Sequence, residues 1–288
     1  MADLLLGQHP LLKKAFIDQR IRDLVGHQFV ADQLFMGSTV DALSIKYYQD
    51  ADVDANGRYS YEEVPETGER SGFKRIGISE EEKQAFIRKY GLEAAISYEM
   101  QKWGQPSAFE RVYRKLALSV KKMVDTMAYN TILNEPNKLG KVKSGGYWNT
   151  AGTGADDMIN DLIDAKTAGK PYAYAVDTVV MSPRTEALLL KNKSIRDAFR
   201  VNNTDLALLR GYIGDFLGLS FITDENFPDD KVLVLQKKII GDIADAEPLK
   251  SKTYNEEQNN KTIVQVTRYV QAYITDPKAI YVIDNIEN

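Results

Sequence analysis

The sequence predicts an α+β protein in which a long helix and an inserted α/β unit are followed by long closing strands. Three observations carry this prediction. Apolar and polar side chains alternate through residues 261–274, as in a strand with one buried face. Helical periodicity continues through residues 107–133, and strand and helix patterns alternate through residues 146–240. A chain that closes on a long strand must pair it with a distant segment, so the sheet is expected to be non-local.

The closing segment divides into two registers. An Asp276-Pro277 turn then leads to a short apolar strand near the end of the chain. One register carries the apolar residues Val264, Val266, Val270, Ala272 and Ile274, and the other carries Gln265, Thr267, Tyr269, Gln271 and Tyr273.

Composition excludes several classes of protein. The 288 residues can hold one large domain or two ordinary ones. Lys and Arg number 37 against 41 Asp and Glu, so no basic excess indicates a nucleic-acid partner. The chain has no cysteine, and its two histidines are His9 and His27 in the N-terminal segment. We therefore expect no enzyme, no catalytic or metal-ligating residues, and no cofactor.

The N-terminal segment predicts an amphipathic helix over residues 3–28. Such a helix binds either a membrane surface or the protein's own fold or a neighbour's. The second interpretation is favoured, because Asp18 and Asp23 dilute the basic charge. The apolar positions are Leu12, Phe16, Ile17, Ile21, Leu24 and Val25.

Residues 29–78 are extended and polar. Ile45 and Tyr47 lead into an Asn56-Gly57 pair, and Tyr59 and Tyr61 lead out of it, which predicts a β-hairpin. Because an isolated two-stranded ribbon is marginal in water, we expect an arm whose partner lies outside the subunit.

Two capping boxes follow, Ser79 with Glu82 and Ser107 with Glu110, and each predicts the start of a helix. The second opens a helix over 107–133, roughly 40 Å long. The segment 86–100 between them is ambiguous, although Gly91 favours a strand. One face of the long helix carries Phe109, Val112, Leu116, Val120, Met123, Val124 and Met127.

The inserted unit follows a glycine-rich, loop-like stretch at residues 134–156. Ser182 caps a predicted helix that has Pro183 in its first turn, and residues 228–230 predict a turn. The other expected elements are helical segments at 158–165, 194–199 and 205–209 and strands at 173–181, 219–222 and 231–235.

Residues 52–63 fit the twelve-residue calcium loop D-x-[DN]-x-[DN]-G-x5-E. An EF-hand requires a helix on both sides of this loop, whereas residues 44–48 are strand-like and Pro65 follows almost directly. A solvated, acidic hairpin tip is therefore the favoured interpretation, and calcium binding stays open as the alternative. The ligands would be Asp52, Asp54, Asn56, the Arg58 carbonyl, Ser60 through its hydroxyl or a water, and Glu63, with Gly57 at the turn.

The order of these elements resembles that of the major capsid proteins of tailed bacteriophages, a fold shared with encapsulins. Four stretches of sequence resemble parts of that family. IRKYGLEAAISYEM resembles the family's entry strand, and DTVVMSPRTEALLL resembles the start of its axial domain. LGLSFITDENFPDDKVLVLQKK resembles the exit from the axial domain, and RYVQAYITDPKAIYVI resembles the closing strands. The resemblance implies an N-terminal arm (1–34), an extended loop with flanking strands (35–78), a peripheral domain (79–145) with spine helix 107–133, an axial domain (146–240), and return strands of the peripheral domain (241–288).

The function implied by the resemblance is self-assembly into hexamers and pentamers. These would form the icosahedral head of a virion, assembled in the host cytoplasm around double-stranded DNA without sequence-specific contacts or a membrane. Because the arm follows Met1 directly, we expect a separate scaffolding protein. A portal and decoration proteins are the other expected partners. The alternatives are an encapsulin-like compartment and a monomeric calcium-dependent binding module.

Some relatives crosslink a lysine of the extended loop to an asparagine near the C-terminus of another subunit. Lys46 or Lys74 would pair with Asn285 or Asn288 in that role. Neither set lies in a sequence context that matches the relatives, so we do not expect crosslinks.

Overall fold

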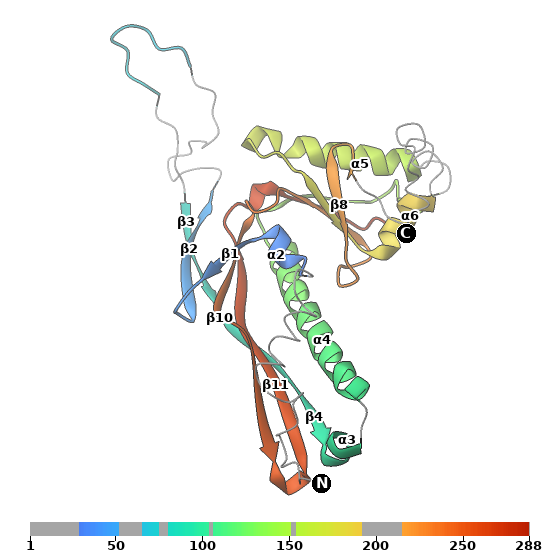
Figure 1. The fold of residues 1–288 in the computed structure, drawn as a ribbon. Helices are drawn as coiled ribbons and strands as arrows, with labels where there is room; N and C mark the ends of the chain where they lie inside the picture. The colour runs from blue at the N-terminus through green and yellow to red at the C-terminus, as the bar shows by residue number, and fades with distance from the viewer. Residues whose placement is uncertain are drawn as a thin grey trace.

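The computed structural model describes residues 29–51, 65–74, 80–103, 106–150, 154–191 and 215–287. Two sheets and a separate two-stranded ribbon make up its strands. Figure 1 shows one sheet alongside the long helix α4 and the other beside helices α5 and α6, with the ribbon β2–β3 projecting from the body.

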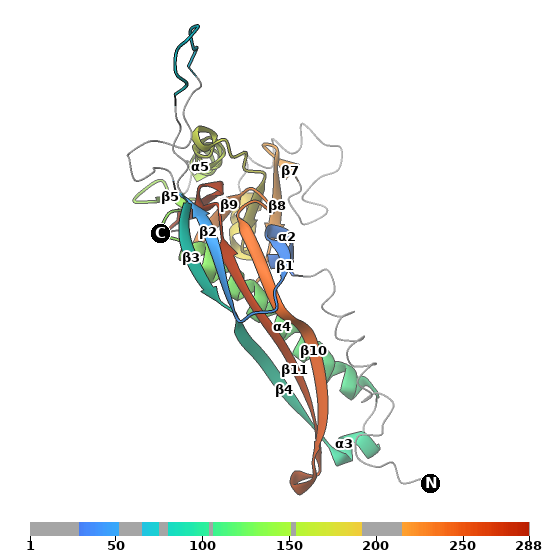
Figure 2. The same ribbon diagram turned by 90° about the vertical axis from the view of Figure 1, so that its left-hand side faces the viewer.

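The first sheet has four strands in the order β1-β10-β11-β4. The pairs β10–β11 and β11–β4 are antiparallel, and β1 runs parallel to β10. Figure 2 shows β4, β11 and β10 side by side along their length, with α4 behind them. The strands are β1 (Met36–Thr39), β4 (Arg88–Ser97), β10 (Gly241–Glu256) and β11 (Lys261–Ile274).

Helix α4 (Pro106–Leu133) confirms the predicted long helix. Its 28 residues span about 42 Å. The expected apolar face is buried except for Val112 and Met123, which are half-buried. The face is wider than expected, because the buried residues also include Tyr113, Ala117, Ala128, Tyr129 and Ile132.

Strand β11 packs against the same apolar core as α4, and its alternation of buried and half-buried residues is as predicted. Its register with Val264, Val266 and Val270 is buried, and Gln265 and Thr267 in the other register are half-buried. Each fully buried side chain of this size contributes about 1.5–3 kcal/mol relative to an exposed one. The sheet and α4 are therefore held together mainly by their shared apolar face.

The second sheet has six strands in the order β5-β12-β9-β6-β8-β7. Helices α5 (Gly154–Ala168) and α6 (Pro183–Lys191) lie beside it (Figure 1). The strands are β5 (Leu139–Val142), β6 (Thr178–Met181), β7 (Asp215–Phe216), β8 (Leu219–Thr223), β9 (Lys231–Leu235) and β12 (Ile280–Asp284).

Strand β12 separates two apolar clusters. Ile280 and Val282 belong to the cluster of α4 and the four-stranded sheet, whereas Tyr281 and Ile283 belong to the cluster that contains α5 residues. A strand that is buried on both faces reads as a continuous apolar run, which explains its sequence. Its partners are β9 and β5, so β12 lies in the six-stranded sheet while one of its faces packs in the α4 cluster.

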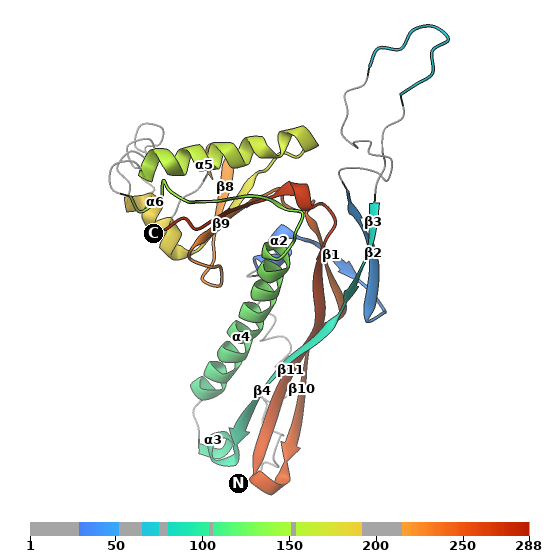
Figure 3. The same ribbon diagram turned by 180° about the vertical axis from the view of Figure 1, so that it is seen from behind.

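The remaining elements are short. Helix α3 follows β4 directly, as Figure 3 shows from behind. Strands β2 and β3 form the ribbon. These elements are α2 (Ala31–Leu34), β2 (Ser44–Asp50), β3 (Glu80–Phe86), α3 (Tyr98–Trp103) and three 3₁₀ turns at Lys170–Tyr172, Glu257–Asn259 and Pro277–Ala279.

The helix predicted from Ser79 and Glu82 is wrong, because residues 80–86 form strand β3. Pairing overrides the local capping signal, as Glu82 lies opposite Tyr48 and its carboxylate contacts the Lys46 ammonium at 2.6 Å. Of the predicted hairpin, only the first strand lies within the described residues. Ile45 pairs with Ala85 of β3, whereas Tyr59 and Tyr61 lie outside the described residues.

Strands β5 and β10 are two of the strands that the sequence did not predict. Strand β5 lies in the stretch that we expected to be loop, and β10 contains Pro248 and many charged residues. Two register shifts in the β10–β11 ladder, between Asp245 and Glu247 and between Glu247 and Lys250, accommodate this irregular stretch. The long strand is therefore specified by its pairing with β11 more than by its own composition.

Several local predictions are confirmed. Gly91 lies within β4, and Ser182 caps α6 by accepting a hydrogen bond from the Thr185 amide at 3.2 Å. The turn at residues 228–230 is present, as are the helix around 158–165 and strands β6, β8 and β9. The segments 3–28, 194–199 and 205–209 lie outside the described residues, and so does the side chain of Ser107.

Candidate functional site

The ribbon β2–β3 has one face that packs on the body of the subunit. Ile45, Tyr47 and Ala85 contact the cluster that contains Tyr273 of β11. The ring centroids of Tyr47 and Tyr273 lie 4.7 Å apart. Burial is the main cause that raises the pKa of Tyr273 to about 12, and its hydroxyl donates to Asp242 at 2.8 Å. This face anchors the base of the ribbon to the four-stranded sheet.

The opposite face of the ribbon is exposed. Phe86 is 61% exposed and Tyr48 is 59% exposed, and both point away from the anchored face because side chains alternate along a strand. A single aromatic residue at a surface is ordinary, but two on one narrow ribbon form a patch suited to a protein partner. The outer ribbon face is therefore a candidate contact surface.

Beyond the ribbon, residues 65–74 project away from both sheets (Figure 1). This stretch has no regular secondary structure, apart from a turn in which the Ser71 amide donates to the Gly68 carbonyl at 3.1 Å. Phe73 is 86% exposed, the most of any large apolar side chain in the described part of the chain. An exposed phenyl ring on a projecting segment is a second candidate contact.

A groove of about 880 Å³ separates the ribbon from α4. Gln84 and Phe86 line it from the ribbon, Lys122 and Asn130 from α4, and residues 271–274 from β11. Apolar and polar atoms both line this groove. It is open to solvent at the surface of the subunit, so it can admit another segment of chain.

The far end of the four-stranded sheet carries an aromatic pair on α3. Tyr98 and Trp103 meet edge to face, with ring centroids 6.2 Å apart. The Lys102 ammonium lies 5.4 Å from the Tyr98 ring and 5.2 Å from the Trp103 ring. Trp103 is 69% exposed, so this end offers a third surface for contact.

Two interactions hold helix α2 against the body. The Asp125 carboxylate accepts a hydrogen bond from the Ala31 amide at 3.0 Å, and the Arg268 guanidinium lies 3.9 Å from the carboxylate of Asp32 in α2. Arg268 is itself held by a bidentate pair with Asp245 of β10, with both contacts at 2.7 Å. Arg268 also lies 5.3 Å from the ring of Phe29. The point where the chain enters the described structure is therefore fixed by buried charges.

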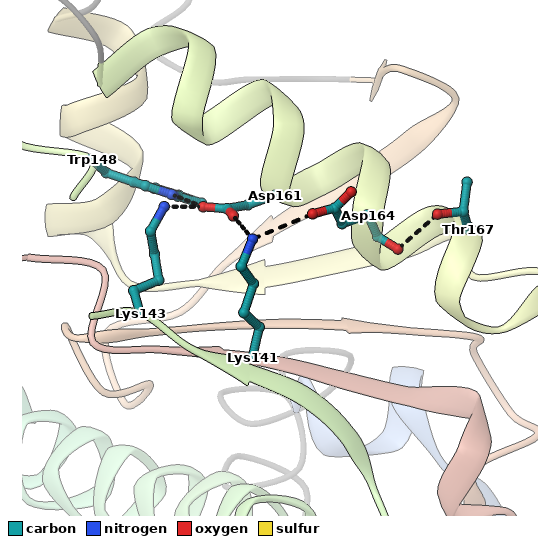
Figure 4. A network of polar contacts seen from close by, with 6 residues as sticks. All are labelled: Lys141, Lys143, Trp148, Asp161, Asp164 and Thr167. Carbon is teal, nitrogen blue, oxygen red and sulfur yellow. Dashed lines mark hydrogen bonds and ion pairs between the residues drawn. The ribbon is translucent and has the colours of Figure 1, made fainter. Parts of the chain in front are cut away.

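A polar network ties the loop after β5 to α5 (Figure 4). The buried Asp161 carboxylate pairs with buried Lys143, accepts a hydrogen bond from the Trp148 indole at 2.8 Å, and contacts Lys141 at 3.1 Å. Burial alone would raise the pKa of Asp161, but the three donors outweigh it and hold the pKa below its ordinary value. An ionised carboxylate with three donors is a structural anchor for the loop.

The predicted site residues are not brought together in the part of the chain that the structure describes. The calcium motif at 52–63 lies outside that part, and so does Asn288. The Lys46 ammonium contacts Glu82, and the Asn285 amide donates to the Lys143 carbonyl at 2.8 Å. Within the described ranges, no cluster of three or more His, Cys, Asp or Glu residues is placed to hold a metal ion. No helix in those ranges is long and apolar enough to span a membrane.

The groove and the α3 aromatic pair were missed at the sequence level. Tyr98 lies in the segment 86–100, which is ambiguous between helix and strand, and Trp103 lies beyond it, so their spacing gives no contact signal. The groove joins the ribbon, α4 and β11, so no local pattern could predict it.

Solved structures with a similar fold include a virus-like particle, a phage-related protein and a phage capsid. The virus-like particle from Pyrococcus furiosus matches at a TM-score of 0.65 with 14% identity, covering 93% of this chain and 98% of that chain. A phage-related protein from Bordetella bronchiseptica RB50 matches at 0.66 with 12% identity, covering 94% and 97%. The mature capsid of bacteriophage PhiM1 matches at 0.60 with 12% identity, covering 90% and 89%. At these identities the likeness establishes the fold.

Sequence comparison identifies the family. No curated protein matches the chain. The family model described as "Phage capsid protein" matches residues 80–283, a range that includes α4 and most of both sheets but not β1. The projecting ribbon and loop agree with a protein that contacts its neighbours, and the match does not favour an encapsulin-like compartment or a calcium-binding module. Because the family model spans well over half of the sequence, this chain belongs to the phage capsid protein family, as a major capsid protein that forms the phage head.

Proposed function

We propose that this major capsid protein assembles as hexamers and pentamers into an icosahedral head around double-stranded DNA. The single observation that carries the proposal is the ribbon β2–β3. One of its faces packs on its own subunit, and the other leaves Tyr48 and Phe86 exposed. A second subunit that covers this face would remove both rings from water, which favours association.

The division of the chain into assembly units is part of the proposal. Residues 1–34 serve as an arm and 35–78 as the extended loop. Residues 79–145 form the peripheral domain with return strands from 241–288, and 146–240 form the axial domain. The topology supports a rigid body made from α4 and the four-stranded sheet, because both contribute to one apolar cluster. The second unit is joined to it through β12, which touches both clusters.

The partners follow from this role. A scaffolding protein, a portal and decoration proteins would act with the shell, which would assemble in the host cytoplasm. The net charge near −4 suits a wall that does not bind the packaged DNA tightly, because that DNA carries its own counterions. The mechanism is association of surfaces, with no catalytic residue, no cofactor and no membrane.

Size-exclusion chromatography followed by electron microscopy tests the proposal on the full chain, expressed alone and with its phage's scaffolding protein. Capsomer rings, tubes or closed shells are the expected products. A lone monomer of 32.5 kDa at every salt and scaffold condition would overturn it.

Paired variants test whether the ribbon carries the association. Tyr48→Ser removes an exposed ring of the ribbon that does not line the groove, whereas Val142→Ser removes a comparably exposed apolar side chain from β5. We expect fewer particles from the first variant and a normal yield from the second. Equal yields from both variants would show that the ribbon does not carry the contact.

A further inference from the structure

Helix α2 lies against α4 at the start of the described chain (Figure 1). Ala31, Leu34 and Phe35 are fully buried in the cluster of α4 and the four-stranded sheet. The Leu34 carbonyl accepts a hydrogen bond from the Lys238 amide at 2.7 Å. The Ala31 amide donates to the carboxylate of Asp125 on α4. A helix of four residues can leave the body in a local opening, which costs less free energy than unfolding of the whole subunit.

The Asp125 carboxylate is fully buried, and only one of its oxygens has a partner. Its Oδ1 atom accepts from Ala31 at 3.0 Å, whereas Oδ2 is buried without a hydrogen-bond partner. An ionised carboxylate in this position loses its hydration and receives one neutral donor in return. Protonation removes most of this cost, because a neutral carboxyl group is much easier to bury than a charged one.

Charged and titratable groups from several elements lie near Asp125. Burial is the largest cause that raises the pKa of Asp125 from 3.8 to about 6, and repulsion from Asp224 and Asp32 adds to it. The Ala31 amide and the Lys121 ammonium act in the opposite direction. The groups are Lys121 and Tyr129 of α4, Asp32 of α2, Asp224 in the turn after β8, and, next to Asp32, Arg268 of β11 and Asp245 of β10.

Asp224 differs from Asp125 in having donors on both of its oxygens. Its Oδ2 atom accepts from the Tyr129 hydroxyl at 2.6 Å. Its Oδ1 atom accepts from the backbone and side-chain amides of Asn226, each at 3.3 Å. Hydrogen bonds of this kind favour an ionised carboxylate. Asp125, with a single donor, is therefore the member of the pair that gains more from a proton.

We propose that Asp125 is a proton-dependent latch for α2, which holds the helix on α4 when protonated and lets it leave more readily when ionised. Departure of α2 opens Asp125 to water, and hydration stabilises the charged form. Docking of α2 is therefore strongest below about pH 3.8, weakens as the pH rises, and is weakest above about pH 6. The docking equilibrium changes by up to about 100-fold over this range.

The latch lies where the proposed N-terminal arm joins the body of the subunit. In the proposed assembly the arm reaches a neighbouring subunit, so ionisation of Asp125 frees it for that contact. This consequence rests on the proposed function. The latch itself belongs to the separated subunit and is tested there.

Hydrogen–deuterium exchange with mass spectrometry tests the latch on the separated, full-length subunit. After correction for intrinsic exchange rates, peptides of residues 30–36 should lose protection by about ten-fold or more between about pH 4.5 and about pH 7.5. Peptides of β12 should stay more protected at each pH, because that strand is buried on both faces and opens only with the subunit. Equal protection of the two regions, or protection of residues 30–36 that does not change with pH, would overturn the proposal.

Two variants and a control assign the effect to Asp125. Asp125→Asn keeps an acceptor for Ala31 and cannot ionise, so residues 30–36 should keep high protection at both pH values. Asp224→Asn keeps an acceptor for Tyr129 and removes the repulsion, so the loss of protection should be smaller than in the natural chain. Asp41→Asn changes an exposed carboxylate and should leave the pH response as it is. A full pH response in Asp125→Asn would overturn the proposal.

Particle formation by the unmodified chain is scored separately. If shells form but the exchange of residues 30–36 does not depend on Asp125, the latch fails and the shell function stands. If the chain never forms particles, the proposed function fails, whatever the exchange data show.

Discussion

Asp125 of α4 accepts a hydrogen bond from the backbone amide of Ala31 at 3.0 Å, across 94 positions of sequence. This contact satisfies an amide at the start of α2 and fixes the entering chain against α4. The second oxygen of Asp125 is buried without a hydrogen-bond partner. Burial, with weaker contributions from Asp224 and Asp32, raises the pKa of Asp125 from 3.8 to about 6.

This raised pKa predicts a pH-dependent stability. An aspartate with a higher pKa in the folded state binds a proton more readily when folded. Ionisation of Asp125 therefore lowers the free energy of unfolding. This loss is absent below about pH 3.8, grows as the pH rises, and is complete above about pH 6. Asp125→Asn removes the charge while keeping an acceptor for Ala31, so the free energy of unfolding of the separated subunit should rise by about 1–3 kcal/mol near neutral pH.

Denaturant titrations at about pH 8 and about pH 4 check this, and the gain from Asp125→Asn should shrink at the lower pH. The control is Asp41→Asn, which changes an exposed carboxylate. A gain of the same size at both pH values would show that the ionisation of Asp125 is not its cause.

The Asp161 network predicts unequal effects for two neighbouring aspartates. Asp161→Asn leaves buried Lys143 without its counter-charge and should lower the free energy of unfolding by about 3–5 kcal/mol. Asp164→Asn removes only an exposed contact to Lys141, so its expected effect is below about 1 kcal/mol. Thermal denaturation of both variants checks the difference, and similar melting temperatures would argue against Asp161 as the anchor.

Arg268 predicts a cost even for a conservative change. Arg268→Lys keeps the charge but loses the bidentate geometry toward Asp245 and the planar group over Phe29. We expect a loss of about 1–2 kcal/mol in unfolding free energy. The half-exposed contact between Lys231 and Asp284 provides the comparison, and Lys231→Arg should be nearly neutral. If Arg268→Lys is equally neutral, the bidentate geometry of Arg268 contributes little to the free energy of unfolding.

Gly241 predicts a steric requirement at the start of β10. Its φ angle is +154°, and an added Cβ atom would lie 2.1 Å from the Tyr273 carbonyl oxygen of β11. Gly241→Ala should therefore displace the paired strands and destabilise the subunit by about 3 kcal/mol or more. Gly37→Ala in β1 meets no atom within 4 Å and should have little effect. Comparison of soluble yield and melting temperature checks both, and equal behaviour of the two variants would refute the steric account.

The sequence predicts best those elements whose pattern follows from one buried face. Strand β11 alternates because only one register faces α4, and α4 itself shows a helical stripe for the same reason. Strand β12 is apolar on both faces, so periodicity could not assign it to a sheet. Ser79 and Glu82 fit a helix cap in sequence, but in the fold Glu82 lies on a strand opposite Tyr48.

The candidate surfaces depend on pairings that no local pattern contains. The ladder between β11 and β4 ends at Val270, and the groove is lined beyond that point by the ribbon, α4 and β11. The exposed aromatic pair Tyr48 and Phe86 lies on one ribbon face only once β2 and β3 are paired. The extended loop was predicted as an arm with an outside partner, whereas the groove could be found only in the structure.

The central claim is that the ribbon and its loop contact a neighbouring copy within a closed shell. A cryo-electron microscopy reconstruction of particles assembled from the full chain tests it most directly. We predict a shell in which the outer ribbon face with Tyr48 and Phe86 is covered by a second subunit. A shell in which this face meets only solvent would contradict the account.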